Sequence, residues 1–134
     1  MTPIERAVVP TTRVLVIDDS SLVRLYYRDA LEKAGFEVEQ AMNGIEGMEK
    51  ALDGRFDLLV VDVNMPKMDG FSFLRELRRS RTTAAAIPAL VITTEAGPED
   101  MKEARAAGAN FYLVKPVAEQ DLVAHAQALS GRLT

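Results

Sequence analysis

Short runs of consecutive apolar residues recur along the chain, and each has the length of one β-strand. The runs VLVI at 14–17 and LLVV at 58–61 are apolar throughout, which is typical of strands buried on both faces of a parallel sheet. The run FEVE at 36–39 alternates apolar and charged residues instead, as a strand near the edge of a sheet does. The complete set of predicted strands is 14–17, 36–39, 58–61, 89–92 and 111–114.

Between these runs the apolar residues return every three or four positions, which predicts amphipathic helices. The first helix begins at Ser20 or Ser21, either of which can cap it, and ends at Gly35. Its apolar stripe consists of Val23, Tyr26, Tyr27, Ala30, Leu31 and Ala34. The next two helices carry Ile45, Met48 and Leu52 before Gly54, and then Phe71, Leu74 and Leu77. A fourth begins at Pro98 and ends at Gly108, and a last one, marked by Leu122, Ala126, Leu129 and Leu133, runs to the end of the chain.

The alternation of strand and helix indicates the fold class. About five β-α units in regular succession predict an α/β domain, with a parallel sheet, helices on both of its faces and right-handed crossovers. Residues 13–134 are expected to form this one domain. Residues 1–12, which include Pro3 and Pro10, are expected to form a short flexible arm.

Composition and charge narrow the classes of function. The chain of 134 residues has a formal net charge of −4 and no Cys. Without cysteine there is no disulfide, thiolate metal site or cysteine nucleophile, and an acidic chain lacks the basic face that unaided nucleic-acid binding needs. No apolar run approaches the roughly 20 residues of a membrane span, and the first residues lack the apolar stretch of a signal peptide. We therefore expect a cytoplasmic protein that binds neither nucleic acid nor membrane.

Polar residues gather at the positions that follow the predicted strands. Asp18 and Asp19 follow the first strand, Asp62 the third, Thr93 the fourth and Lys115 the last. Such sheets bind ligands at the carboxyl ends of their strands, where crowded carboxylates repel one another unless a cation relieves them. With oxygen donors only, Mg²⁺ fits better than Zn²⁺ and leaves positions for phosphoryl oxygens. Any one of these residues alone is more simply a helix cap or a solvated charge, but together they favour a site.

Several stretches, in this order, carry a resemblance to a known family. They are VIDDSS at 16–21, DVNMPKMDG at 62–70, ITTEA at 92–96, AGA at 107–109 and YLVKP at 112–116. On these motifs the sequence resembles the response-regulator receiver domains, and among them the single-domain chemotaxis regulators, over residues 13 to about 130. The resemblance implies a flavodoxin-like, doubly wound fold with parallel strands in the order 2-1-3-4-5.

The resemblance also implies the roles of the residues at the strand ends. Asp62 would be the phospho-acceptor, whose carboxylate attacks phosphorus to form an acyl phosphate. Asp19 and Asp62 would bind Mg²⁺ directly, together with the main-chain carbonyl of Asn64, and Asp18 would act mostly through a metal-bound water. Lys115 would pair with a phosphoryl oxygen. These roles suit phosphoryl transfer, which needs mainly positioning and charge neutralisation.

The same resemblance implies which residues would act in switching and in dephosphorylation. The hydroxyl of Thr93 would bind a phosphoryl oxygen, and the ring of Tyr112 would follow that hydroxyl's movement. Asn64 and Glu95 would flank the path of the hydrolytic water, and their polar side chains predict a phosphoryl lifetime of seconds to minutes. The Lys115-Pro116 peptide bond would be cis.

The chain ends where the receiver domain ends, so no output domain is expected and signalling must use a protein contact that depends on phosphorylation. The expected function is a stand-alone, chemotaxis-like switch and not an enzyme. Its partners would be a sensor histidine kinase or histidine phosphotransfer protein and a downstream target protein. An alternative is a phosphorelay intermediate that passes its phosphoryl group to a histidine phosphotransfer protein. A remote alternative is a haloacid-dehalogenase-type phosphatase, although that family has a D-x-D pair where this chain has Asp18-Asp19-Ser20.

Two leucines of the first predicted helix lie beside its apolar stripe. Leu22 and Leu25 fall toward the solvent edge, next to the predicted acidic site. They form a small apolar ledge that suits docking of a kinase helix, and partial packing against the N-terminal arm explains them nearly as well. The basic residues at 75–81 and the lone His125 are expected to be solvated helix residues.

Overall fold

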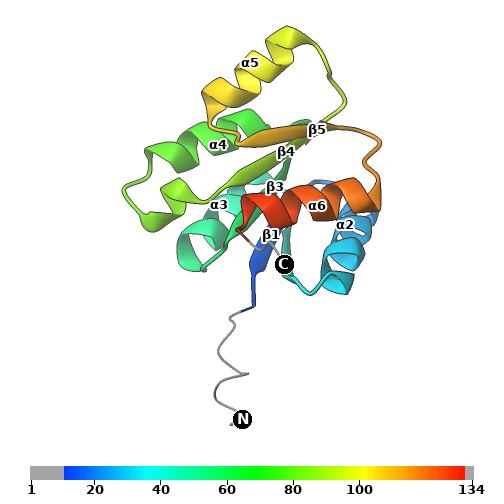
Figure 1. Cartoon of the computed structure of the whole chain (residues 1–134). Coiled ribbons are helices and arrows are strands. Elements are labelled where there is room, and N and C mark those ends of the chain that lie inside the picture. Colours follow the sequence, from blue (N-terminus) through cyan, green and yellow to red (C-terminus); the bar gives the residue numbers. More distant parts are fainter. Residues whose placement is uncertain (1–10, 132–134) are drawn as a thin grey trace.

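The centre of the molecule is one parallel sheet, described by a computed structural model that covers residues 11–131 (Figure 1). Its five strands pair in the order β2-β1-β3-β4-β5, so the predicted fold class and strand order are confirmed. The strands are β1 (Arg13–Ile17), β2 (Glu37–Ala41), β3 (Leu58–Asp62), β4 (Ala89–Thr93) and β5 (Phe111–Val114). The helices are α2 (Ser21–Lys33), α3 (Gly44–Asp53), α4 (Gly70–Arg79), α5 (Pro98–Ala107) and α6 (Glu119–Leu129), with a short 3-10 helix, η1 (Thr83–Ala86).

Both faces of the sheet are covered, because alternate side chains of each strand enter different cores. On one side, Leu15 and Val61 belong to a buried cluster with residues of α3, α4 and α5. On the other side, Val16 and Val60 belong to a second cluster with residues of α2 and α6. The central strands β3 and β4 are buried along their whole length, which explains why their sequences are apolar without alternation.

Several helix ends lie where the sequence predicts them. The hydroxyl of Ser20 accepts a hydrogen bond from the backbone N of Val23 at 3.3 Å and so caps α2. Pro98 occupies the first turn of α5, and Gly108 ends that helix with a left-handed φ of 108°. These positions use the backbone preferences of serine, proline and glycine.

The buried face of α3 differs from the predicted one. Its buried residues include Gly47 and Ala51, whereas Ile45 and Leu52, from the predicted stripe, are 53% and 45% exposed. The helix lies so close to the sheet that a Cβ at position 47 would be 2.7 Å from the side chain of Ile17. The prediction was wrong for Ile45 and Leu52, which are left outside because small residues permit this close approach. The third residue of the predicted stripe, Met48, is partly buried against the core.

The strand after α2 begins later than predicted. β2 spans Glu37–Ala41 and not 36–39, and Phe36 is a buried core residue just before it. The register places Arg13 of β1 opposite Glu37, and the two side chains form an ion pair with an N–O distance of 3.1 Å. Pairing with β1 therefore determines where this strand begins.

The last helix is shorter than predicted. It ends at Leu129, and Gly131 follows with a φ of 76°, a left-handed conformation in which a helix ends. Leu133 and residues 1–10 of the predicted arm lie outside the described residues. Within residues 11–131, no helix has both the length and the apolar character needed to cross a membrane.

One residue of the basic stretch at 75–81 is not solvated, contrary to the prediction. The guanidinium of Arg78 donates hydrogen bonds to the carbonyls of Ala85 at 2.9 Å and Ile87 at 2.7 Å. It also donates twice to the carbonyl of Gly108, at 2.8 and 3.1 Å. Arg78 thereby joins α4 to η1 and to the end of α5, and its burial lowers the pKa of the guanidinium from its ordinary value.

Candidate functional site

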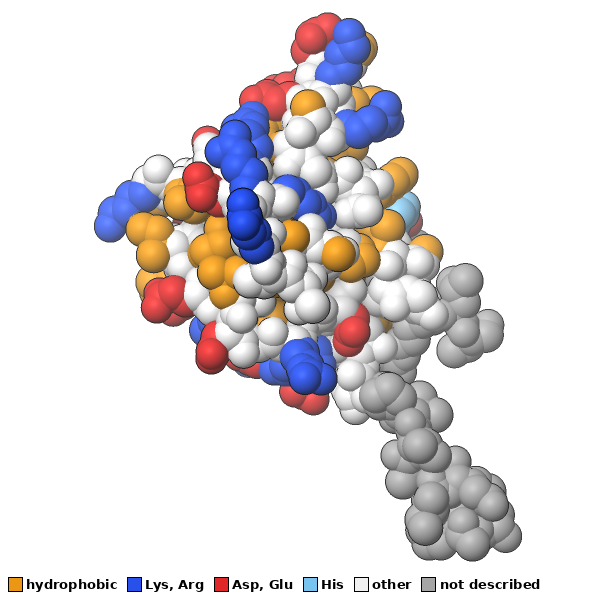
Figure 2. All heavy atoms as spheres, turned by 90° about the vertical axis from the view of Figure 1, so that its left-hand side faces the viewer, with side chains coloured by type: hydrophobic (Ala, Val, Ile, Leu, Met, Phe, Trp, Pro, Cys, Tyr) orange, Lys and Arg blue, Asp and Glu red, His pale blue; other side chains and the backbone are white. Residues whose placement is uncertain are grey.

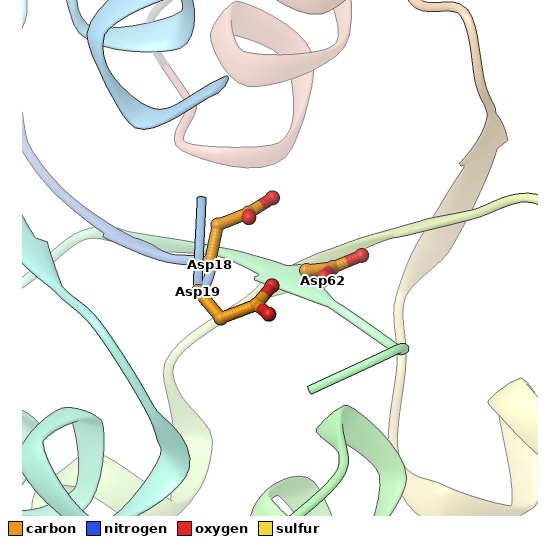
Figure 3. A group of neighbouring side chains, drawn as sticks. All are labelled: Asp18, Asp19 and Asp62. Carbon is orange, nitrogen blue, oxygen red and sulfur yellow. The ribbon is translucent and has the colours of Figure 1, made fainter. Parts of the chain in front are cut away.

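Three aspartates meet at the carboxyl ends of the central strands. Asp18 and Asp19 directly follow β1, and Asp62 is the last residue of the neighbouring strand β3. Figure 3 shows the three side chains gathered around one space, and one carboxylate oxygen from each lies within 4.8 Å of the other two. Asp18 and Asp62 are buried, and Asp19 is exposed. The structure thus brings together the three carboxylates that the sequence places at the strand ends.

Asp18 is fixed by the chain around it. Its Oδ1 accepts a hydrogen bond from the backbone N of Ser20 at 2.8 Å, an Asx turn that leads into α2. Its carbonyl accepts from Nη1 of Arg24 at 2.6 Å, and its backbone N donates to the carbonyl of Ala41 at 3.1 Å. The residue therefore has a structural role as well, and Oδ2 is the carboxylate atom that remains for a ligand.

Asp62 is positioned by the loop between β3 and α4. The backbone N–H of Asn64 favours the ionised carboxylate and so opposes the rise in its pKa. Gly70, at the start of α4, lies against the same strand end, where a Cβ would be 2.4 Å from the carbonyl oxygen of Asp62. The backbone N of Gly70 donates to the carbonyl of Val63 at 3.0 Å and closes the loop. Glycine is required at position 70 because a side chain would collide with backbone.

Lys115 faces this acidic cluster from the end of β5. Its Nζ lies 3.1 Å from Oδ1 of Asp62, so the two side chains form an ion pair. Burial is the main cause that raises the pKa of Asp62, and Lys115 opposes it. Burial also raises the pKa of Asp18 to about 6, with the charge of Asp62 adding to the effect. The ionised cluster is therefore an unfavourable concentration of negative charge.

The donor atoms of the cluster fit a small, hard dication. They are carboxylate oxygens. Within residues 11–131 the buried Oδ2 of Asp18 has no hydrogen-bond partner, and the buried Oδ1 of Asp62 faces the ammonium of Lys115. Buried polar atoms are rarely left in this state unless a ligand or water completes them. Mg²⁺ prefers oxygen donors and typically uses one or two carboxylates, so these residues fit it. The main-chain carbonyl of Asn64 as a further ligand stays a prediction.

Thr93 and Glu95 lie next to the acidic cluster, after β4. Thr93 is buried, and its Oγ1 accepts a hydrogen bond from the backbone N of Glu95 at 3.0 Å. The side chain of Asn64 is exposed, and its Nδ2 donates to Oγ1 of Thr94 at 3.2 Å. Thr93, Asn64 and Glu95 line a cavity of about 500 Å³ that extends between residues of α4 and α5. The cavity therefore lies beside the residues that the sequence assigns to switching and dephosphorylation.

The predicted switch residue Tyr112 lies in β5, half-buried against the core on the α3–α5 side of the sheet. The Lys115-Pro116 peptide bond that follows the strand is cis, as the sequence predicts. At the other end of β5 the ring of Phe111 stacks on His125 of α6, with centroids 4.7 Å apart. His125 is thus partly covered by a neighbouring ring and is not simply solvated, as the sequence predicted.

The leucine ledge predicted on α2 is exposed. Leu22 and Leu25 have exposed fractions of 77% and 41%. Leu22 also lines an apolar groove of about 550 Å³ that extends to Lys115, whereas Leu25 is not among the lining residues. Tyr26, which the sequence assigns to the core, lies in the same groove, and its hydroxyl donates to the carbonyl of Val117 at 3.0 Å.

Two residues near the acidic cluster were not identified from the sequence. Tyr27 is a core residue as predicted, and its phenol also interacts with the charges of the acidic cluster. Burial is the main cause that raises the pKa of Tyr27 above the usual range, and the charges of Asp18 and Asp62 raise it further. Arg24 binds the carbonyl of Asp18. The interaction of Tyr27 with the cluster was not predicted because this residue belongs to the apolar stripe of the helix. The contact of Arg24 was not predicted because this residue lies on the polar side of the same helix.

The chain is similar to a large group of known proteins. A sequence model of the response regulator receiver domain matches residues 14–127. The chain is 38% identical over 122 residues to the response regulator MprA of Mycobacterium ulcerans, covering 91% of this chain and 51% of that protein. It is 41% identical over 103 residues to the gliding motility regulatory protein of Myxococcus xanthus, covering 77% of this chain and 13% of that protein. The chain therefore spans about half of the first relative and a small part of the second.

Solved structures share the fold over nearly the whole chain. The chemotaxis protein CheY4 of Vibrio cholerae has a TM-score of 0.85 and 39% identity, covering 90% of this chain and 99% of that one. The receiver domain of the sensor histidine kinase PA1611 of Pseudomonas aeruginosa has a TM-score of 0.83 and 26% identity, covering 91% and 99%. That structure holds a magnesium ion coordinated in its active-site cleft.

Proposed function

The chain belongs to the response-regulator receiver family, which makes it a receiver domain of a two-component system, and we propose that it acts as a stand-alone phosphorylation switch. A receiver domain is a signalling domain and implies a histidine kinase as partner. We assign Asp62 as the phospho-acceptor. One observation carries this assignment: the buried carboxylate of Asp62 lies 3.1 Å from Lys115 and within 4.8 Å of carboxylate oxygens of Asp18 and Asp19.

In the proposed reaction an oxygen of Asp62 attacks the phosphorus of a phosphohistidine in line with the N–P bond. The new O–P bond gives an acyl phosphate, while the N–P bond breaks and the imidazole leaves with the bonding electrons. The ammonium of Lys115 neutralises one phosphoryl oxygen, and the hydroxyl of Thr93 donates to another. Thr93 suits this role because its oxygen already accepts a hydrogen bond from Glu95, which leaves its proton available.

We assign the acidic cluster as an Mg²⁺ site, with Asp19, Asp62 and the main-chain carbonyl of Asn64 as ligands and Asp18 acting through a bound water. When bound, the ion neutralises charge on the carboxylates and on the phosphoryl oxygens. The buried Oδ2 of Asp18, which has no hydrogen-bond partner within residues 11–131, supports this assignment. The magnesium in the cleft of the similar PA1611 receiver domain supports it as well.

The proposed output is a chemotaxis-like protein contact, made in the cytoplasm, that depends on phosphorylation. Movement of the Thr93 hydroxyl toward the phosphoryl group would free space for Tyr112, whose half-buried ring lies in β5. The similarity to CheY4 supports contact with a target protein, and the net charge of −4 opposes direct nucleic-acid contact by this domain. The similarity to a receiver domain of a sensor histidine kinase favours, as an alternative, a phosphorelay intermediate.

The central test is transfer from a small phosphoryl donor. With Mg²⁺ and acetyl phosphate, the wild type is expected to form an acyl phosphate, detected by mass or by radiolabel, and Asp62→Asn is expected to form none. Removal of Mg²⁺ with EDTA should also prevent labelling. Asp53→Asn, which changes an exposed carboxylate of α3, is the matched control and should label normally. Label retained by Asp62→Asn would show that the acceptor is wrong, and turnover of a generic phosphomonoester would favour the phosphatase alternative.

We further propose that Leu22 and Leu25 dock the helix that bears the kinase histidine, because both are exposed on α2 and Leu22 lines the apolar groove that extends to Lys115. Replacing both with Gln should slow transfer from the cognate kinase about tenfold and leave labelling by acetyl phosphate unchanged. Replacing Ile45 and Leu52 of α3, which have comparable exposed fractions of 53% and 45%, is the control. Unchanged transfer from the kinase in the Leu22 and Leu25 variant would exclude this docking site.

A further inference from the structure

The phenol of Tyr27 is a buried polar group that the proposed reaction does not use. Tyr27 is 3% exposed and belongs to the same buried cluster as Val16 of β1. Within residues 11–131 its hydroxyl forms no hydrogen bond, whereas the hydroxyl of the neighbouring Tyr26 donates to the carbonyl of Val117 at 3.0 Å. Because buried polar groups rarely lack a partner, the hydroxyl of Tyr27 is available to a group that binds or moves nearby.

The fold directs this phenol toward the acidic cluster. Side chains of a helix lean toward its amino end, and α2 begins at Ser21, two residues after Asp19. Tyr27 lies six residues further along α2, which is about 9 Å along the helix axis. Its side chain also lines the apolar groove together with Lys115, whose Nζ is 3.1 Å from the carboxylate of Asp62. The hydroxyl therefore lies on the side of α2 that faces the cluster.

The phenol keeps its proton beside the cluster. Burial is the main cause that raises the pKa of Tyr27, and the negative charges of Asp18 and Asp62 raise it further. A neutral phenol donates one hydrogen bond. The ammonium of Lys115 has donors only and cannot accept this proton, so the carboxylates are the acceptors that the cluster offers.

Asp18 is the carboxylate best suited to accept this hydrogen bond. Its Oδ1 accepts from the backbone N of Ser20 at 2.8 Å, but within residues 11–131 its buried Oδ2 has no hydrogen-bond partner. Oδ1 of Asp62 faces the ammonium of Lys115 instead. The charge of Asp18 also raises the pKa of Tyr27 more than the charge of Asp62 does. A free donor on α2 and a free acceptor after β1 thus belong to neighbouring elements.

The groove beside Tyr27 gives these side chains room to move. It has a volume of about 550 Å³ and lies on the side of the sheet that α2 and α6 cover. The cavity that Thr93 lines is instead between residues of α4 and α5. Figure 2 shows the face that α3 and α4 help to form, where hydrophobic side chains are interspersed with charged ones. A change in the groove therefore leaves the Thr93 cavity and this face as they are.

We propose that Tyr27 is a positioning residue of the Mg²⁺ site, whose hydroxyl donates the hydrogen bond that Oδ2 of Asp18 lacks. The inference rests on the proposed function, because it presupposes that Mg²⁺ binds at the cluster. A small shift of the two side chains into contact accompanies binding of the ion. The bond favours the ionised carboxylate and fixes its orientation, so Asp18 is ready to hold the bound water that we assign to it. Groups that orient a metal ligand in this way contribute to metal affinity.

Calorimetric titration of the full chain with Mg²⁺ alone measures this contribution. Tyr27→Phe, which keeps the ring and removes only the hydroxyl, should weaken Mg²⁺ binding about fivefold. Tyr26→Phe is the matched control, because it removes a hydroxyl from the adjacent residue of the same groove, and it should bind Mg²⁺ as the wild type does. Labelling of Tyr27→Phe by acetyl phosphate should be slower at limiting Mg²⁺ and equal to the wild type at saturating Mg²⁺. A general loss of structure would slow labelling at both concentrations.

A double-mutant cycle tests whether the hydroxyl acts through Asp18. In an Asp18→Ala background, Tyr27→Phe should weaken Mg²⁺ binding no further, and a full second loss would overturn the proposal. Equal Mg²⁺ affinity of Tyr27→Phe and the wild type would overturn it too, and a loss confined to Tyr27→Leu would show that the ring acts by packing alone. A wild type that binds no Mg²⁺ would overturn the Mg²⁺ assignment together with this inference, which distinguishes that failure from a failure of Tyr27 alone.

Discussion

Two groups of charge in this domain, one half-buried and one largely buried, have very different sets of partners. The half-buried guanidinium of Arg78 donates to three backbone carbonyls, those of Ala85, Ile87 and Gly108. In the acidic cluster, by contrast, the buried Oδ2 of Asp18 has no hydrogen-bond partner within residues 11–131, and the buried Oδ1 of Asp62 faces the ammonium of Lys115. A buried charge whose partners are all present holds the fold together, whereas one whose partners are missing is ready for a ligand.

The contrast has a physical cause in the partners that the fold supplies. Arg78 meets carbonyl groups near the carboxyl ends of η1 and α5, where helix dipoles concentrate negative charge. The three aspartates meet one another and a single ammonium, that of Lys115. Burial therefore raises the pKa of Asp18 and Asp62, so forming the ionised cluster weakens the fold until a cation binds. Removing the charge of Arg78 should accordingly lower the stability of the fold, whereas neutralising the acidic cluster should raise it.

The largest expected effect is loss of stability on removing the charge of Arg78. Arg78→Met leaves the carbonyls of Ala85, Ile87 and Gly108 without their donor, and we expect the free energy of unfolding in urea to fall by about 3 kcal/mol. Arg75→Met is the control from the same helix, because its side chain is 41% exposed and pairs with Glu103 at 3.6 Å. That variant should lose less than about 0.5 kcal/mol. Equal losses of unfolding free energy in the two variants would mean that the hydrogen bonds of Arg78 do not stabilise the fold.

Protonation of the acidic cluster is expected to change stability less, and in the opposite direction: the free energy of unfolding should rise. The pKa of Asp18 is about 6 in the folded protein, against an ordinary value of 3.8. Between these values the folded state binds more protons than the unfolded state, so stability must rise as the pH falls. Without Mg²⁺, protonation of Asp18 should add about 1 kcal/mol to the free energy of unfolding between pH 7.5 and pH 5.

Urea unfolding at the two pH values, with and without Mg²⁺, measures this effect. Asp18→Asn should remove the part of the rise in unfolding free energy that protonation of Asp18 causes. Mg²⁺ should stabilise the wild type more at pH 7.5 than at pH 5, because at pH 5 protons compete for the same carboxylate oxygens. A pH dependence that is identical in wild type and Asp18→Asn would contradict the assignment of the raised pKa to Asp18.

The difference between Arg78 and the acidic cluster also explains what could be predicted from the sequence. The strand order makes Asp18 and Asp62 neighbours, because both follow apolar runs that become adjacent parallel strands. Local pattern and topology were enough to place these carboxylates together. Arg78 satisfies carbonyls from segments that follow it along the chain. Backbone carbonyls are present at every residue and leave no pattern in a sequence, so its burial could not be predicted.

The misplaced face of α3 has a related cause. Hydrophobicity favours burial of Ile45 and Leu52, but α3 approaches the sheet closely at the small residues Gly47 and Ala51. That separation is a property of the packed structure and not of the helix alone. The same packing leaves Ile45 and Leu52 on the surface.

The smallest expected effect concerns the openness of the acidic cluster to water. Asn64 is exposed beside Asp62, and its Nδ2 donates a hydrogen bond to Oγ1 of Thr94 at 3.2 Å. This side chain leaves the site open to water, so the wild-type acyl phosphate should decay within seconds to minutes. Asn64→Arg should slow this decay several-fold, because a longer basic side chain covers the phosphoryl group and pairs with it. Gln120→Arg, which adds the same charge at an exposed position of α6, is the control. The decay of label after removal of the donor measures the rate, and an unchanged rate in Asn64→Arg would show that this side chain does not control the access of water.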